Sequence, residues 1–97
     1  MLSKVKGEIE LLERHLEVLR TVVKHQPIGI MKLSELMDMP YHRIRYSLRV
    51  LEQLGYIRAS PAGAVATSLS EELLCDLDQR LEELRELLGT MKMGTNP

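Results

Sequence analysis

The side chains best suited to bind a polyanion lie together in residues 40–51. Arg43, Arg45 and Arg49 follow one another closely there, with His42 and two tyrosines among them. Asp and Glu are absent from residues 39–51, although the chain as a whole carries a net charge of only −1. Such a local excess of positive charge is typical of a surface that contacts the phosphates of a nucleic acid.

The same segment has the periodicity of an amphipathic helix. With successive side chains about 100° apart, Ile44, Leu48 and Leu51 fall on one side together with Ser47. The basic residues fall on the opposite side. We therefore predict a helix over residues 40–54 that packs its apolar side on a core and turns its basic side to DNA. The candidate DNA-binding residues are Tyr41, His42, Arg43, Arg45, Tyr46 and Arg49, together with Arg58 beyond the helix.

Some of these assignments have a structural alternative. The arginines would also suit a helix face that is merely solvated and binds nothing. The ring of Tyr46 would equally suit a partly buried position against the first helix of the chain. Both alternatives stay open at the level of the sequence.

Other elements must position the basic helix. The apolar repeat over residues 3–25 predicts a long N-terminal helix, which ends before Pro27 because proline disfavours helix at the preceding residue. A short helix over residues 30–37 follows, and Asp38, Met39 and Pro40 then force a tight turn. Gly55 is expected to end the basic helix in the left-handed conformation.

The second half of the chain is predicted to form a hairpin and another long helix. Residues 56–59 and 64–67 flank a Ser-Pro-Ala-Gly turn, which is typical of a two-stranded β-hairpin. A capping box that begins at Ser68 predicts a helix over residues 69–88. Gly89 is expected to stop this helix, because glycine is common just beyond helix ends.

These elements give the predicted fold class, which is mainly α with a small β-hairpin in a single domain. The hairpin and the two helices before it occupy residues 27–67, between the long helices over residues 3–25 and 69–88. Residues 89–97 show no periodicity and are expected to form a flexible tail. A chain of 97 residues supports one modest core, to which a dimer would add buried area.

Both long helices carry a leucine-rich seam. Apolar residues recur in each at alternating steps of three and four, which is the spacing of a coiled coil. The first helix also carries a second apolar stripe, which would pack on the core while the seam contacts another body; alternatively, both stripes pack within one small domain. We predict a homodimer through residues 1–20, residues 70–88 or both. Its predicted contacts are Leu2, Val5, Ile9, Leu12, Leu16, Leu74, Leu77, Leu81, Leu84 and Leu88.

The sequence shows no recognisable catalytic centre. It contains no phosphate-binding loop, no His-Glu-x-x-His and no cysteine pair, and His15, His25 and His42 lie on different segments. We therefore expect neither an enzyme nor a metal or cofactor site. Cys75 is the single cysteine, so it forms no internal disulfide, and it is expected at a helix surface or partly buried rather than as a sensor.

Nothing in the sequence directs the chain into a membrane. Met1 is followed at once by charged residues and leucines, and no stretch reaches the ~18 apolar residues that a membrane span needs. Together with the single cysteine, this predicts a soluble cytoplasmic protein without a membrane partner.

Residues 27–67 contain a recognisable run of motif residues. These are Leu33, Ser34 and Glu35 in the first short helix, Met37, Asp38 and Met39 at the turn, and Ile44, Leu48, Leu51, Glu52, Gly55 and Ile57 after the turn. Together with the order of the predicted elements, they resemble a winged helix-turn-helix. The resemblance is specific for the fold more than for DNA binding.

The pattern is most similar to that of small archaeal transcription regulators of the MarR and ArsR type. This resemblance implies that the helix over residues 40–54 lies in the major groove of DNA, with its N-terminal residues at the base edges. Arg45 and Arg49 lie one turn apart, and each would suit a guanine edge. The hairpin departs from the family pattern, because its turn is short and uncharged and only Arg58 at its base could contact DNA. Asp38 is a second departure, since the family's turn usually has glycine there, and aspartate is among the next-best residues for that backbone conformation.

Two functions follow from these observations. The first is a homodimeric transcription regulator that binds double-stranded DNA sequence-specifically, which the acid-free basic face favours. The alternative is a winged-helix module that binds proteins of the transcription or chromosome machinery, which the net acidity and the uncharged hairpin turn favour. Any small-molecule effector would have to use the crevice between the long helices and the motif, because the sequence shows no separate ligand domain.

Overall fold

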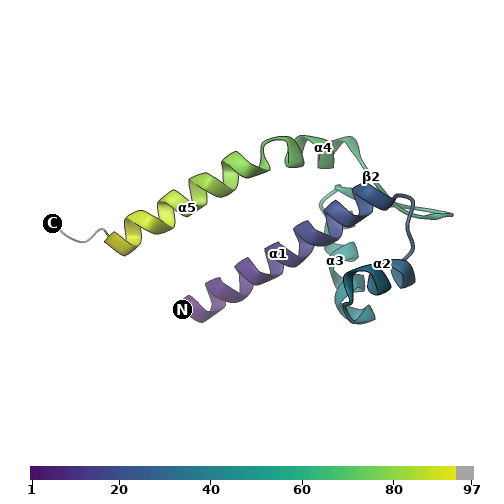
Figure 1. Cartoon of the computed structure of the whole chain (residues 1–97), viewed down its shortest axis with the longest axis horizontal. Coiled ribbons are helices and arrows are strands. Elements are labelled where there is room, and N and C mark those ends of the chain that lie inside the picture. The colour runs from purple at the N-terminus through teal and green to yellow at the C-terminus, as the bar shows by residue number, and fades with distance from the viewer. Residues whose placement is uncertain (94–97) are drawn as a thin grey trace.

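The computed structural model describes residues 1–93, which form five helices and one β-hairpin (Figure 1). The predicted mainly helical fold with a small hairpin is confirmed. The bounds of the first three helices agree with the predicted ones to within one residue. The elements are α1 (Leu2–His25), α2 (Ile30–Met37), α3 (Tyr41–Gln53), β1 (Ile57–Ser60), β2 (Gly63–Ala66), α4 (Ser68–Cys75) and α5 (Leu77–Met93).

The core forms where α1, α2, α3 and the hairpin meet. Val18 and Leu19 of α1, Leu33 of α2 and Ile44 of α3 have no exposed surface, and Ile57 of β1 is 4% exposed. These residues lie on the apolar sides of their elements, and each Å² of apolar surface that they remove from water contributes about 25 cal/mol. The core therefore fixes the inner side of α3 and leaves its outer side free.

The hairpin is attached to the rest of the domain through the segment after α1. β1 and β2 pair antiparallel, with Ile57 opposite Ala66. Ile28 forms a bridge to β2: its N–H donates to Ala64 O at 3.1 Å, and its O accepts from Ala64 N–H at 2.7 Å. A two-stranded hairpin is marginal by itself, so this bridge helps to hold it beside α3.

Two residues in the left-handed conformation set the path into and out of α3. Asp38 has φ 49° and ψ 51°, and its N–H donates to Glu35 O at 3.3 Å, which ends α2. Gly55 has φ 87°, and its N–H donates to Glu52 O at 3.0 Å. Both positions match the sequence prediction, because glycine adopts this backbone region most easily and aspartate more easily than most residues.

The predicted single C-terminal helix is interrupted at Asp76. This residue has φ −114° and ψ 19° and separates α4 from α5. Leu77, which follows, is only 5% exposed. The N–H of Arg80 donates to Asp76 O at 3.1 Å, and its Nε donates to Asp76 Oδ2 at 3.0 Å. The interruption thus buries a leucine and places an acid at the start of α5, where the helix dipole favours it.

The predicted capping box of Ser68 and Glu71 is wrong. Thr67, not Ser68, is the residue before α4, and no side chain caps this helix. The Thr67 hydroxyl instead donates to Gly55 O at 2.6 Å. A contact across the fold therefore takes the hydroxyl that a local cap would have used.

Gly89 does not stop α5, and residues 89–93 of the predicted tail are helical. A Cβ at Gly89 would have nothing within 4 Å, so this glycine stands on an open helix surface. Glycine in a helix interior costs about 1 kcal/mol relative to alanine, which the leucines and glutamates around it offset as good helix formers. The rest of the predicted tail, residues 94–97, lies outside the described residues.

The two long helices extend side by side away from the core region. Figure 1 shows α1 and α5 running roughly parallel in opposite chain directions, so that the N-terminus and the end of α5 lie at the same end of the molecule. The molecule measures 58 × 27 × 21 Å. No helix within residues 1–93 is both long and apolar enough to cross a membrane.

Candidate nucleic-acid interface

Helix α3 turns its predicted basic side to solvent. Its inner side is buried through Ile44, Ser47 and Leu51, which are at most 2% exposed. Leu54, which follows the last residue of α3, is 57% exposed. The outer side carries the exposed residues Tyr41, His42, Arg43, Arg45, Tyr46 and Arg49.

Two side chains of α1 hold the inner side of α3. Ser47 Oγ accepts a hydrogen bond from Arg14 Nε at 3.2 Å and lies 2.8 Å from His15 Nδ1. A neutral imidazole accepts the Ser47 proton at Nδ1. Burial, followed by the charge of Arg14, lowers the pKa of His15 below its usual 6.5, and this favours the neutral form.

The contact with Arg14 was not predicted from the sequence. The sequence feature that indicates such a contact is Ser47, a hydroxyl on the apolar side of the predicted helix, because a buried hydroxyl needs a hydrogen-bond partner. Arg14 and Ser47 are 33 positions apart, so the local pattern did not indicate which residue supplies that partner.

Tyr46 is both partly packed against α1 and partly exposed, so it fits each of the two positions that its sequence allowed. Its side chain is 46% exposed. Its ring centroid lies 5.9 Å from that of His15, with the rings inclined at 42°, which is a normal separation for packed rings. One part of the Tyr46 ring therefore packs on α1, and the other part is accessible to a ligand.

Within residues 1–93 the arginines of this surface form no ion pair, although Glu10, Glu13 and Glu17 of α1 line the same pocket as Arg43. No ion pair within residues 1–93 includes an arginine of α3 or β1; the ion pairs lie on α1, on α2, and on or just before α5. Arg45 is held instead by a tyrosine of its own helix, because its Nη2 donates to Tyr41 Oη at 2.6 Å. The positive charge of α3 is therefore free to act on an outside partner.

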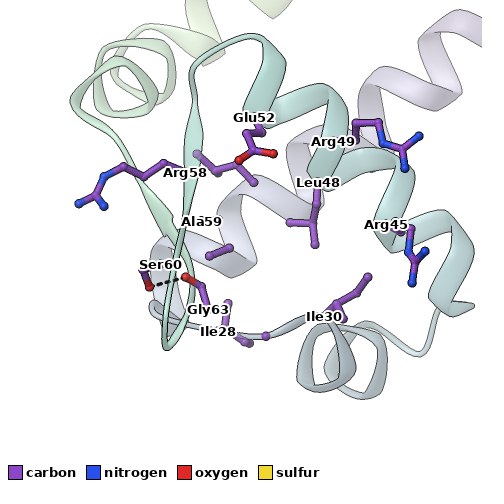
Figure 2. Close-up of a pocket in the computed structure, with 13 residues that line it drawn as sticks. Ile28, Ile30, Arg45, Leu48, Arg49, Glu52, Arg58, Ala59, Ser60 and Gly63 are labelled. Carbon is purple, nitrogen blue, oxygen red and sulfur yellow. Dashed lines mark hydrogen bonds between the residues drawn. The ribbon is translucent and has the colours of Figure 1, made fainter.

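A groove separates α3 from the hairpin (Figure 2). Its volume is about 340 Å³. Leu48 of α3 and Ile30 of α2 line it with apolar surface, and the hairpin contributes the small residues Ala59, Gly63 and Ala64. These small side chains leave the space between the hairpin and α3 open.

Charged residues border this groove. Figure 2 shows Arg45 and Arg49 on the α3 side and Arg58 extending outward from the hairpin, with Glu52 between them. All four side chains are exposed. The fold thus brings Arg58 to the groove that adjoins α3, whereas the turn of the hairpin contributes no charge, as its sequence indicates.

The described part of the chain has no evident metal site. No group of three or more His, Cys, Asp or Glu side chains within residues 1–93 is placed to hold a metal ion. Cys75 is exposed at the end of α4, in agreement with the sequence prediction.

The predicted dimer contacts fall into two groups. Leu16 and Leu77 are buried within the chain, at 8% and 5% exposure, and Leu74 packs against the core. A groove of about 280 Å³ between α1 and α5 includes Leu16 in its lining. The remaining contacts have exposures of 36 to 73% and are Leu2, Val5, Ile9 and Leu12 on α1 and Leu81, Leu84 and Leu88 on α5.

The fold is similar to that of a solved protein domain. The activation domain of the phage T4 transcription factor MotA matches with a TM-score of 0.64 and 22% sequence identity, over 78% of this chain and 83% of that chain. At this identity the similarity concerns the fold alone. No protein-family model matches the sequence, and no curated protein matches it in sequence.

Proposed function

We propose that this protein is a cytoplasmic transcription regulator that binds double-stranded DNA through α3. The proposal is carried by the exposed basic side of α3, on which no arginine has an acidic partner within residues 1–93. Neutralisation of phosphates by Arg and Lys supplies a large share of the affinity for DNA and all of its dependence on salt. Arginines already paired with carboxylates would contribute little to that affinity.

The packing of α3 on the rest of the domain also suits the binding of a DNA duplex. The core and the Arg14–Ser47 contact fix its inner side, so its outer side is available to enter the major groove. The N-terminal residues of such a helix reach base edges, and the flanking parts contact the backbone. Arg58 would supply a backbone contact from β1. Because the hairpin turn is uncharged, α3 would make most of the contacts.

The residue pattern over residues 27–67 supports a regulator of the winged helix-turn-helix class, of the small archaeal MarR and ArsR type. The similarity in fold to a domain of a transcription factor agrees with this class. Sequence-specific recognition requires contacts to base edges as well, since an exposed basic face by itself accounts only for binding that is independent of sequence.

The active form in this proposal is a homodimer. Leucines and other apolar residues are exposed along the outer halves of α1 and α5, and such exposed apolar surface is typical of a protein interface. A two-fold dimer would present two copies of α3 to major grooves about 34 Å apart. Sedimentation that shows a monomer at micromolar concentration would contradict this part of the proposal.

A salt titration of duplex binding tests the proposal as a whole. A dimer with roughly 6 to 10 phosphate contacts loses ~10³ to 10⁵ in affinity between about 50 and 200 mM salt. The double variant Arg45→Ala/Arg49→Ala should lose duplex binding and keep its helical circular dichroism, because both side chains are exposed. The control Arg80→Ala/Arg85→Ala removes the same charge from α5 and should still bind. Undetectable binding of any duplex at low salt would contradict the proposal.

A second candidate function is a protein-binding module. It is favoured by the apolar groove between α3 and the hairpin, which the charged backbone of a duplex would not fill and an apolar side chain of a partner would. The similar MotA domain is described as an activation domain. Ala59→Leu would fill this groove and leave the arginines in place, so it should preserve duplex binding if α3 binds DNA.

A further inference from the structure

The contact between Tyr41 and Arg45 distinguishes one arginine of α3 from the others. Tyr41 is the first residue of α3, and Arg45 follows one turn later. Arg45 Nη2 donates to Tyr41 Oη at 2.6 Å, and Arg45 Cζ lies 4.7 Å from the centroid of the Tyr41 ring. Arg45 is therefore held in two ways, by a hydrogen bond and by the face of a ring.

The other two arginines of α3 are free of such contacts. Within residues 1–93 the arginines whose side chains donate hydrogen bonds are Arg14, Arg45, Arg80 and Arg85. Arg43 and Arg49 are exposed and have no such bond. Their guanidinium groups can therefore point in many directions, whereas that of Arg45 has a preferred one.

A preferred direction affects what an arginine can recognise. Fixing a flexible side chain on a ligand costs conformational entropy, and a side chain that is already held loses less. A guanidinium carries several N–H donors, so the bond to Tyr41 leaves others free for a ligand. A phosphate has acceptor oxygens in many directions, but the O6 and N7 atoms of guanine must be met by a planar guanidinium in one orientation.

The geometry points to Arg45 as the residue that reads a guanine in the major groove, to Tyr41 as its positioning residue, and to Arg43 and Arg49 as phosphate contacts. This assignment rests on the proposed binding of DNA by α3. It also agrees with the place of the pair, because Tyr41 and Arg45 lie in the first two turns of α3, and the N-terminal residues of a recognition helix reach base edges.

Selection from a pool of random-sequence duplexes tests the assignment. The wild-type protein should enrich duplexes with a guanine at a fixed position, and replacing that guanine by adenine should weaken binding roughly 5- to 150-fold. Arg45→Ala should remove this preference and still bind the pool at low salt. Arg49→Ala should weaken binding equally for both bases and reduce the slope of affinity against salt by about one.

Two variants of Tyr41 separate its ring from its hydroxyl. Tyr41→Leu removes both contacts and should reduce the preference for guanine roughly two- to fivefold, and Tyr41→Phe, which keeps the ring, should reduce it less. Duplexes with 7-deazaguanine lack the N7 acceptor and should bind the wild type more weakly, yet bind Arg45→Ala as well as normal duplexes do. If Arg45 had a purely structural role, Arg45→Ala would still bind duplexes with 7-deazaguanine more weakly than normal duplexes.

The outcomes distinguish this assignment from the proposed function. A guanine preference unchanged in Tyr41→Leu, or removed by Arg49→Ala as fully as by Arg45→Ala, would overturn the assignment and leave DNA binding intact. Failure of the wild type to bind any duplex would overturn the proposed function and the assignment with it. All three substituted side chains are exposed, with Tyr41 at 40%, so circular dichroism should show the wild-type fold in every variant.

Discussion

His15 Nδ1 lies 2.8 Å from Ser47 Oγ, and this contact joins the long helix α1 to the inner side of α3. Arg14, the neighbour of His15, donates to the same hydroxyl at 3.2 Å. Ser47 has no exposed surface. The orientation of the basic helix is therefore set by polar contacts with α1 as well as by the apolar core.

Removing the Ser47 hydroxyl should destabilise the fold. Ser47→Ala leaves the part-buried side chains of Arg14 and His15 without their partner at this site, and a buried polar group without a partner costs about 1 to 3 kcal/mol. The free energy of unfolding in urea should fall by this amount. Ser68→Ala is the matched control, because Ser68 is exposed, and it should change stability much less. Equal stability of the two variants would contradict a structural role for the contact.

The protonation of His15 should make the free energy of unfolding depend on pH. Burial, and then the charge of Arg14, lowers the pKa of His15 in the folded protein below the 6.5 of the free side chain. Between these two values the unfolded chain binds more protons than the folded one, so stability is full above pH 6.5 and falls as the pH drops toward the folded pKa. We expect the unfolding free energy of the wild type to fall over this range relative to that of His15→Gln.

Comparison with His15→Gln isolates this residue, since the other titrating groups are the same in both proteins. Glutamine stays uncharged and still offers an acceptor to Ser47. A difference in unfolding free energy between the two proteins that stays constant from pH 8 to pH 5 would show that His15 does not titrate as the structure implies.

Replacing Gly63 should disturb the hairpin and the groove that it borders. Gly63 has φ 131°, and a Cβ there would lie 2.5 Å from Ile28 C and 2.6 Å from Ile28 O. Gly63→Ala should therefore lower the free energy of unfolding by at least the ~1 to 3 kcal/mol that such backbone strain costs. A Cβ at Gly7 in α1 would have nothing within 4 Å. Gly7→Ala should therefore raise the free energy of unfolding by roughly 0.5 to 1 kcal/mol. Thermal unfolding of both variants gives the comparison.

Charges on the outer half of α5 should prevent dimerisation. Leu84 and Leu88 are 50% and 49% exposed, and each leucine buried in an interface contributes ~1.5 to 3 kcal/mol. Leu84→Glu/Leu88→Glu should therefore shift a wild-type dimer to monomer in sedimentation and keep its helical content. Leu36→Glu/Leu54→Glu places the same charges on exposed positions away from α5 and should leave the dimer intact. The same shift in both double variants would mean that the effect is not specific to α5.

The sequence by itself determined the elements that depend on near neighbours. Spacing of apolar residues placed α1, α2 and α3, because a helix with one apolar side must bury that side wherever it packs. Asp38 and Gly55 were recognisable as turn residues from their own backbone preferences. The basic side of α3 was visible as well, since helical periodicity alone separates it from the apolar side.

Tertiary structure decided what depends on residues far apart in the chain. The Thr67 hydroxyl donates to Gly55 O instead of capping α4. Ser47 contacts Arg14 and His15, which lie 33 and 32 positions away from it in the sequence. The groove beside α3 lies between this helix and the hairpin, which the bridge between Ile28 and Ala64 helps to hold in place. No local pattern contains these contacts: each requires the packed core to bring two segments within hydrogen-bond range, and the gain from satisfying a buried polar group then outweighs the local preference.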